Sequence, residues 1–170
     1  PDHPIARHVQ MHGDGIGVIA LQVPDAAAAF RETTSRGAEP AMAPVEARDD
    51  HGVLRESAIH VYGDTLIKFV ERGEYTGVFA PAFRPTGRKA SRSDGVGLLA
   101  VDHIVGNVDL GAMDKWVRFF AETMGFTQLA HFDDKTITTE YSALMSKVMQ
   151  DGTGRVKFPI NEPATGKRKS

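Results

Sequence analysis

Cysteine is absent from all 170 residues of the chain. Disulfide bonds and thiolate metal ligands are therefore excluded. The absence is compatible with a reducing compartment, and we expect a cytoplasmic protein.

An excess of charge of one sign is also lacking, since the formal net charge is −2. Phosphate binding needs a concentrated basic face, so we expect no nucleic-acid partner. No apolar run approaches the roughly 20 residues that cross a bilayer, and we expect no membrane association. Pro1 to Pro4 show neither an initiator Met nor a signal-peptide pattern, and the last residues hold no apolar element. We expect an internal fragment of a longer protein.

Hydrophobic residues make up 41% of the chain and charged residues 25%, which is typical of a packed domain. Residues 15–23 are largely apolar and β-branched and predict a buried strand. Asp25 suits the start of a helix and Gly37 its end. Three further strands are expected over 38–44, 53–61 and 64–72. The first part of the chain therefore predicts the order βαβββ.

The second part repeats this order. Residues 98–108 predict a strand, and residues 111–124 predict a helix with one apolar stripe, formed by Met113, Trp116, Val117, Phe120 and Met124. Three strands are expected over 126–132, 141–149 and 156–160, with a turn at 151–154. The fold class is thus α+β, with tandem βαβββ modules. Such small modules need a partner to bury their sheets, and the partners can lie outside this chain.

Three segments follow from this pattern: a module over 1–73, a linker over 74–97 and a module over 98–170. The linker is rich in Gly, Pro, Arg and Ser and has no periodicity. Its aromatic residues Tyr75, Phe79 and Phe83 predict that it packs against a domain.

His103 is the candidate functional residue, because it lies within an apolar predicted strand. Alternate side chains of a strand share a face, so Val101, His103 and Val105 should point together. A buried imidazole needs a hydrogen bond or a metal. On physical grounds alone, a hydrogen-bonded core histidine is the more frequent case. Val18 occupies the matching position in the first module, which suits one catalytic and one structural module. The other histidines fit a polar leader, turns and strand ends: His3, His8, His12, His51, His60 and His131.

Four runs, in this order and spacing, resemble the 4-hydroxyphenylpyruvate dioxygenase family: VDHIVGNV (101–108), EYSAL (140–144), PINEPA (159–164) and KRKS (167–170). The resemblance covers nearly the whole chain. It implies the vicinal-oxygen-chelate fold of paired βαβββ modules. Residues 1–73 would be the second module of the N-terminal domain, and residues 98–170 the first module of the catalytic domain.

The resemblance also implies a site. The family holds Fe(2+) with two histidines and a glutamate, and His103 matches the first histidine. Nothing in this chain matches the motifs of the other two ligands, so the isolated chain should be inactive. Four residues would line the substrate pocket by motif match: Val105, Ser142, Pro159 and Asn161. No catalytic residue beyond the metal ligand is predicted.

The implied reaction is the oxidative decarboxylation and ring hydroxylation of 4-hydroxyphenylpyruvate to homogentisate in tyrosine and phenylalanine catabolism, with dioxygen as the second substrate. A homo-oligomer is expected at full length. The alternative enzyme is 4-hydroxymandelate synthase, with the same fold, metal and substrate. A non-catalytic, glyoxalase-like binding module is the alternative of another class, and it would need no histidine at position 103.

Overall fold

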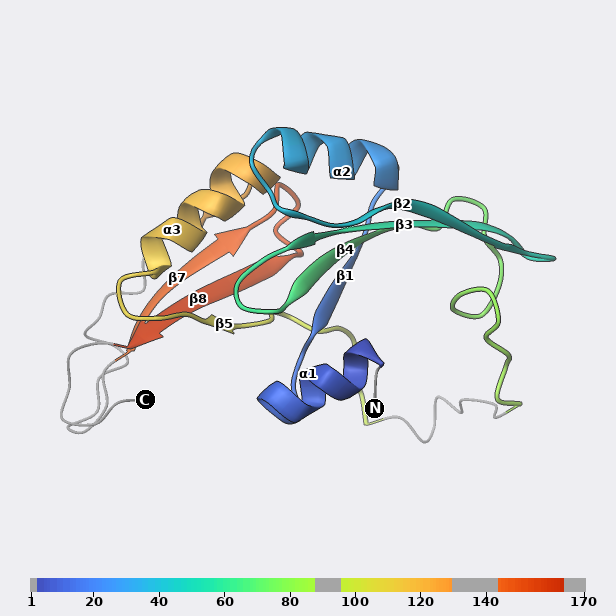
Figure 1. The fold of residues 1–170 in the computed structure, drawn as a ribbon, viewed down its shortest axis with the longest axis horizontal. Coiled ribbons are helices and arrows are strands. Elements are labelled where there is room, and N and C mark those ends of the chain that lie inside the picture. Colours follow the sequence, from blue (N-terminus) through green and yellow to red (C-terminus); the bar gives the residue numbers. More distant parts are fainter. Residues whose placement is uncertain (1–2, 88–95, 130–143, 164–170) are drawn as a thin grey trace. The chain divides into compact units, whose positions relative to one another are not determined.

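The computed structural model describes residues 3–87, 96–129 and 144–163. Contacts divide the chain into two units, Pro1–Val96 and Gly97–Ser170. Each unit has a four-stranded sheet in the order first, last, third, second strand (Figure 1). The predicted α+β fold with tandem βαβββ modules is therefore confirmed.

The first unit runs α1 (Pro4–His12), β1 (Val18–Gln22), α2 (Ala26–Ser35), β2 (Pro40–Asp49), β3 (Gly52–His60) and β4 (Leu66–Glu71). Strand β1 is parallel to β4, and the other neighbours are antiparallel. Helix α2 begins at Asp25, whose Oδ1 accepts a hydrogen bond from the Ala28 amide at 2.7 Å. Five apolar residues facing α2 or within the sheet form the core: Ile19, Leu54, Ile59, Ile67 and Phe69.

Helix α1 was not predicted, because residues 3–12 had been interpreted as a polar leader. The helix has local start signals, since Pro4 stands in its first turn and His3 Nδ1 accepts from the Ile5 amide at 3.2 Å. None of its residues is buried. A helical spacing of apolar residues was present in the sequence, since Ile5 and Val9 stand four residues apart, but the interpretation as a polar leader overlooked it.

The second unit runs β5 (Gly106–Asn107), α3 (Met113–Arg118), a π-helical turn η2 (Phe119–Thr123), β6 (Thr127–Gln128), β7 (Leu144–Gln150) and β8 (Lys157–Pro163). Its core is aromatic: Phe120 and Phe126 stack on Phe158 with ring centroids 5.1 and 5.9 Å away. The predicted apolar stripe of the helix is confirmed, because Met113 and Phe120 are buried and Trp116, Val117 and Met124 are half buried.

The strand predicted over 98–108 is wrong for most of its length, and His103 does not lie in a strand. Only Gly106 and Asn107 form β5, paired with Ile160 and Asn161. Continued backwards, this register places residue 103 beside Lys157, where β8 begins. Residues 98–102 would face the 151–156 turn, which offers no strand edge to pair with. The apolar side chains there are exposed instead, Leu98 at 90% and Leu99 at 98%.

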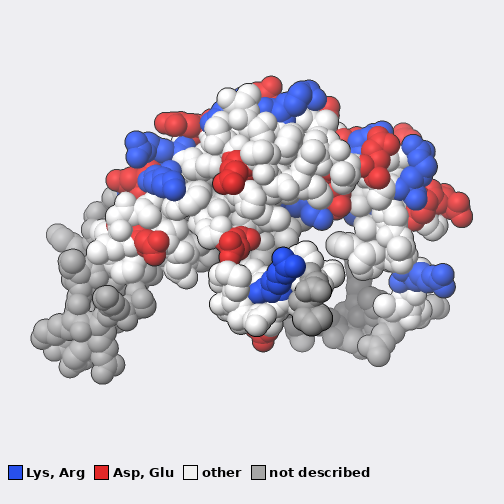
Figure 2. Space-filling model, viewed as in Figure 1, with Lys and Arg blue, Asp and Glu red and all other residues white. Residues whose placement is uncertain are grey.

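Acidic and basic side chains are interspersed on the face shown in Figure 2, without a large field of one sign among the coloured residues. Within the described ranges, no helix has the length and apolar character to span a membrane.

Candidate metal and substrate site

The residues of the two sheets can be matched one to one, because each sheet has an equivalent backbone hydrogen bond at the end of its first strand. The Val23 amide donates to the Val70 carbonyl at 3.0 Å, and the Val108 amide donates to the Asn161 carbonyl at 2.8 Å. In each case the first strand ends against the last strand. Counting back five residues from each amide pairs His103 with Val18. The position that carries an imidazole in the second unit thus carries a hydrocarbon in the first.

One face of the second sheet is covered by helix and the other is open. Along β8, exposure alternates, with Phe158, Ile160 and Glu162 buried towards the helix. Along residues 103–107, Ile104 and Gly106 are the less exposed residues, whereas His103 and Val105 are exposed. On β8, Pro159 and Asn161 alternate with the buried residues and lie on the open face. Residues 103–105 are not in a strand, and it is their exposure that places His103 and Val105 on the same open face. Four of the five predicted site residues share this face.

The remaining predicted residue, Ser142, lies outside the described residues. Its neighbours along the chain lead into β7, which pairs with β8 through Ser146 and Asn161. Ser142 thus stays a prediction.

His103 is half exposed and has one carboxylate partner. Its Nδ1 lies 2.7 Å from Oδ2 of Asp102, whose Oδ1 lies 3.3 Å from Lys157 Nζ. The hydrogen bond from His103 and then the Lys157 ammonium hold the pKa of the Asp102 carboxyl below its usual value. Asp102 is therefore ionised at neutral pH. The Nε2 atom of His103 makes no hydrogen bond to any part of the chain that the structure describes.

Asn161 has a buried side-chain oxygen. Its Oδ1 has no hydrogen-bond partner among the described residues, although the residue as a whole is only half buried. A buried carbonyl oxygen without a donor is costly, which makes it a good acceptor for an incoming hydroxyl or amide. Asn161 also lines a cavity of about 540 Å³, together with Asn107, Asp109 and Pro163 among others.

The open face has an order along β8. The register places His103 beside Lys157, Val105 beside Pro159 and Asn107 beside Asn161. At about 3.3 Å per residue, the His103 and Asn161 levels are roughly 13 Å apart. A ligand that reaches both would be elongated, with an apolar middle against Val105 and Pro159.

Glu162 faces the other way and has a structural partner. It is 6% exposed, and its Oε2 accepts from the Met113 amide at 2.9 Å, at the start of α3. Glu71 occupies the matching position in the first unit, where its Oε2 accepts from the Ala26 amide at 3.1 Å. A carboxylate at a helix N-terminus satisfies a free amide and opposes the positive end of the helix dipole. Glu162 is therefore turned away from the open face and is engaged in the fold.

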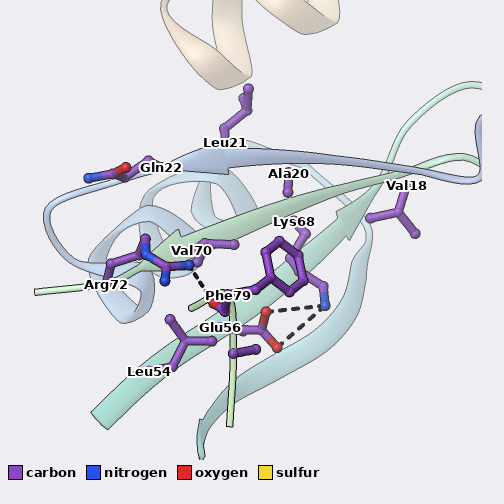
Figure 3. A pocket seen from close by; sticks show the side chains of 11 residues that line it. Val18, Ala20, Leu21, Gln22, Leu54, Glu56, Lys68, Val70, Arg72 and Phe79 are labelled. Atoms are coloured by element: carbon purple, nitrogen blue, oxygen red, sulfur yellow. Dashed lines mark hydrogen bonds and ion pairs between the residues drawn. The ribbon is translucent and has the colours of Figure 1, made fainter. Parts of the chain in front are cut away.

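The open face of the first unit carries a cavity of about 320 Å³ (Figure 3). Val18, Val70 and Phe79 supply apolar lining, and Lys68 Nζ lies 3.3 Å from both carboxylate oxygens of Glu56. The two charges neutralise each other, and none of the lining residues is a histidine. Among the described residues that line this cavity, Glu56 is the one carboxylate, and it is already paired with Lys68.

The linker region packs on the first unit in part, as predicted. Tyr75 is buried and its hydroxyl donates to Asp49 Oδ2 at 3.0 Å. Arg72 donates to the Phe79 carbonyl at 2.6 Å. Phe79 and Phe83 form an edge-on pair with centroids 4.9 Å apart, and each is 60% exposed.

Across the described ranges, no three His, Cys, Asp or Glu side chains gather in an arrangement able to hold a metal ion. Among the described histidines, His12 also has a carboxylate partner, since its Nε2 lies 2.6 Å from Asp64 Oδ2. His103 could thus supply one ligand, and any further ligands would have to come from elsewhere.

Sequence reasoning missed Asp102 and Lys157. Asp102 had a signal in the sequence, since it directly precedes the histidine in an otherwise apolar run. Lys157 lies 55 residues after Asp102, and no local pattern links Lys157 to this segment.

Comparison with known proteins matches residues 100–170 to the family model described as the Glyoxalase/Bleomycin resistance protein/Dioxygenase superfamily. Curated relatives match nearly the whole chain. A 4-hydroxyphenylpyruvate dioxygenase from Aspergillus fumigatus is 42% identical over 98% of this chain and 42% of its own length. Those from Yarrowia lipolytica and Dictyostelium discoideum are 37% and 39% identical. The resemblance found in the sequence motifs is confirmed.

Among solved structures, a triple variant of 4-hydroxymandelate synthase from Streptomyces coelicolor aligns with a TM-score of 0.69 at 20% identity, over 96% of this chain and 45% of that protein. A fusion of a xylose isomerase-like TIM barrel with 4-hydroxyphenylpyruvate dioxygenase aligns with a TM-score of 0.68, also at 20% identity, over 97% of this chain and 24% of that one. These likenesses show the fold alone. The chain spans less than half the length of the curated relatives given above.

Proposed function

We propose that this chain, similar over 98% of its residues to 4-hydroxyphenylpyruvate dioxygenases, is part of an enzyme that converts 4-hydroxyphenylpyruvate and dioxygen to homogentisate and carbon dioxide. That similarity is the observation that carries the proposal. The position of His103 on the open face of the second sheet supports it. The reaction would belong to tyrosine and phenylalanine breakdown.

His103 would supply one nitrogen ligand to an iron(II) ion. The residues present fit this role, because Asp102 occupies Nδ1 and leaves Nε2 without a partner in the described chain. The other ligands of the family, a histidine and a glutamate, would lie in a later part of the full-length protein. When bound, such an ion supplies open positions for a chelating 2-oxo acid and for dioxygen.

The rest of the open face would hold the substrate. Val105 and Pro159 offer an apolar surface for the aromatic ring, midway along the face. The unpartnered Oδ1 of Asn161 would accept a hydrogen bond from the phenol hydroxyl at the far end. His103 would lie at one end of the open face and the Asn161 acceptor at the other. This elongated arrangement suits an arylpyruvate, which carries its 2-oxo acid and its phenol hydroxyl at opposite ends. Ser142 would add a hydroxyl by motif match.

Product analysis tests the proposal directly. The complete enzyme, loaded with iron(II) and given 4-hydroxyphenylpyruvate, should consume dioxygen and release homogentisate. Release of 4-hydroxymandelate would assign the alternative activity on the same fold. Binding of the substrate without turnover would assign a non-catalytic binding module. The 170-residue chain alone should give no homogentisate, because one imidazole cannot hold the ion as a chelate does.

The setting of the enzyme is part of the proposal. We expect a cytoplasmic homo-oligomer that binds small molecules, without nucleic-acid or membrane partners. Light scattering on the purified full-length protein tests the oligomeric state.

A further inference from the structure

We infer that Asp102, anchored by Lys157, is a positioning residue that fixes the His103 imidazole with its proton on Nδ1 and its lone pair on Nε2, ready for a divalent metal ion. The inference rests on the proposed function and adds two residues to that site. It concerns the state of the ligand before any metal binds.

The direction of the hydrogen bond follows from chemistry. An ionised carboxylate only accepts hydrogen bonds, so a neutral imidazole facing Asp102 must donate. The atom 2.7 Å from Asp102 Oδ2 is Nδ1. The proton therefore sits on Nδ1, and the lone pair is left on Nε2. Metal-bound histidines commonly donate their other ring nitrogen to a carboxylate in this way, which fixes the tautomer and the ring orientation.

The local backbone makes this contact feasible. In a regular strand, neighbouring side chains point to opposite faces and do not meet. Residues 102 and 103 precede β5 and are not in a strand, so Asp102 can reach the ring of the next residue. The short β5 is thus a requirement of the arrangement. A regular strand over 98–108 would separate the two side chains.

Lys157 ties this segment to β8 in two ways. Its carbonyl accepts from the Ile104 amide at 3.3 Å, and its Nζ lies 3.3 Å from Asp102 Oδ1. The first contact holds the backbone that follows His103, and the second holds the carboxylate that faces it. Both oxygens of Asp102 are then engaged, one by Lys157 and one by His103. The carboxylate cannot rotate without losing a partner.

The chain contains a built-in comparison. His12 meets Asp64 through Nε2, at 2.6 Å. By the same reasoning its proton sits on Nε2, which is the opposite tautomer. The Asp64 pair links α1 to the turn before β4 and is unrelated to the open face of the second sheet. It provides a matched control for any measurement on His103.

The tautomer can be measured in the complete protein prepared without metal. The ¹⁵N shifts of the ring nitrogens distinguish protonated from bare nitrogen, and a pH of about 9 keeps ordinary imidazoles neutral. His103, assigned by its loss in His103→Ala, should carry its proton on Nδ1, and His12 on Nε2. Asp102→Ala should move His103 towards the Nε2-protonated form that free histidine prefers in water. Asp64→Ala should leave His103 unchanged.

Metal affinity in the complete enzyme gives the second readout, with Co(II) as the probe. Asp102→Ala should weaken binding by about 10–100-fold. Asp102→Asn, which keeps an acceptor oxygen, should recover part of the loss, and Lys157→Met should weaken binding less than Asp102→Ala.

Two results would overturn the inference: a wild-type His103 protonated on Nε2, or equal Co(II) affinity with and without the Asp102 carboxylate. Either result would leave the proposed function standing, because product analysis tests that separately. A wild-type enzyme that binds no Co(II) and makes no homogentisate would instead remove the proposed function, and the metal-directed role of Asp102 with it.

Discussion

Among single residues, Asn161 bears most directly on how a substrate would be held. Its Oδ1 is buried and has no partner in the described part of the chain, while its backbone carbonyl accepts from the Val108 amide. The hydrogen bond from Val108 fixes the backbone of Asn161 and so the position of its side chain. The Oδ1 atom can then accept a hydrogen bond from a hydroxyl or amide of a ligand. Binding of a donor would relieve the cost of that buried oxygen.

Replacement of Asn161 by Leu keeps a similar volume and removes the acceptor. In the complete enzyme, oxygen uptake should persist, because it depends on the metal-bound end of the substrate. Less homogentisate should be released per oxygen consumed, because small displacements of the ring change which atom reacts. Chromatographic product analysis beside oxygen uptake measures this ratio, and a ratio equal to wild type would remove Asn161 from the site.

The ionised carboxylate of Asp151 stabilises the turn between β7 and β8, and this stabilisation depends on pH. It accepts from the Thr153 hydroxyl at 2.6 Å and from the amides of Arg155 and Val156 at 3.1 Å. The bond from Thr153, followed by those from the backbone amides, holds the pKa of the Asp151 carboxyl below its usual value. A depressed folded-state pKa means that the stabilisation is present above the ordinary aspartate pKa near 4 and is lost as the pH falls through the folded value.

Asp151→Asn should therefore lower the urea midpoint at pH 7, and the gap to wild type should shrink as the pH drops below about 4. Unfolding curves at pH 7 and at low pH measure this gap. Asp50→Asn, in the exposed turn between β2 and β3, is the control and should change little. A gap that stays constant down to low pH would show that the Asp151 carboxylate does not make these bonds.

At the scale of elements, the glutamate near the end of each last strand connects sheet and helix. Glu71 and Glu162 occupy equivalent positions and accept from the first amides of α2 and α3. This recurrence in two units of different sequence indicates a role in the fold. In the second unit it ties the start of α3 to the end of β8.

Glu162→Ala should lower the free energy of unfolding by about 2 kcal/mol, because it leaves a buried amide unpaired and removes a charge-assisted bond. Glu162→Gln keeps an acceptor and should cost less. Glu122→Ala, at an exposed position of η2, serves as control and should have an effect within about 0.5 kcal/mol. Chemical denaturation measures all three, and equal stability of Glu162→Ala and wild type would refute the role.

Several elements were predictable because local pattern and tertiary packing agree. The apolar run at 15–23 and Asp25 predict β1 and the start of α2, and both form near the predicted residues. The strand over 98–108 failed because a strand also needs an edge to pair with, and the 151–156 turn provides none. Helix α1 was missed although Pro4 and the four-residue spacing of Ile5 and Val9 were local signals for it, because its many histidines favoured the interpretation as a polar leader.

At the scale of the whole molecule, two sheets of one topology carry different open faces. The first presents an apolar cavity with a self-neutralised Glu56–Lys68 pair, and the second presents His103 and the Asn161 acceptor. The repeat and this asymmetry were predictable from the sequence. The contact between Asp102 and Lys157 was not, since Lys157 lies 55 residues further along the chain and only the pairing of β5 with β8 brings the two together.

The central claim is that His103 is an iron ligand of a 4-hydroxyphenylpyruvate dioxygenase. The most direct test measures bound iron and homogentisate formation together, in the complete enzyme carrying His103→Ala, with His51→Ala at an exposed turn as the control. We expect His103→Ala to lose both iron and activity while its thermal stability stays close to wild type, and His51→Ala to keep all three. Retention of normal iron content and more than about a tenth of the wild-type kcat, a barrier change below ~1.4 kcal/mol, would contradict the assignment.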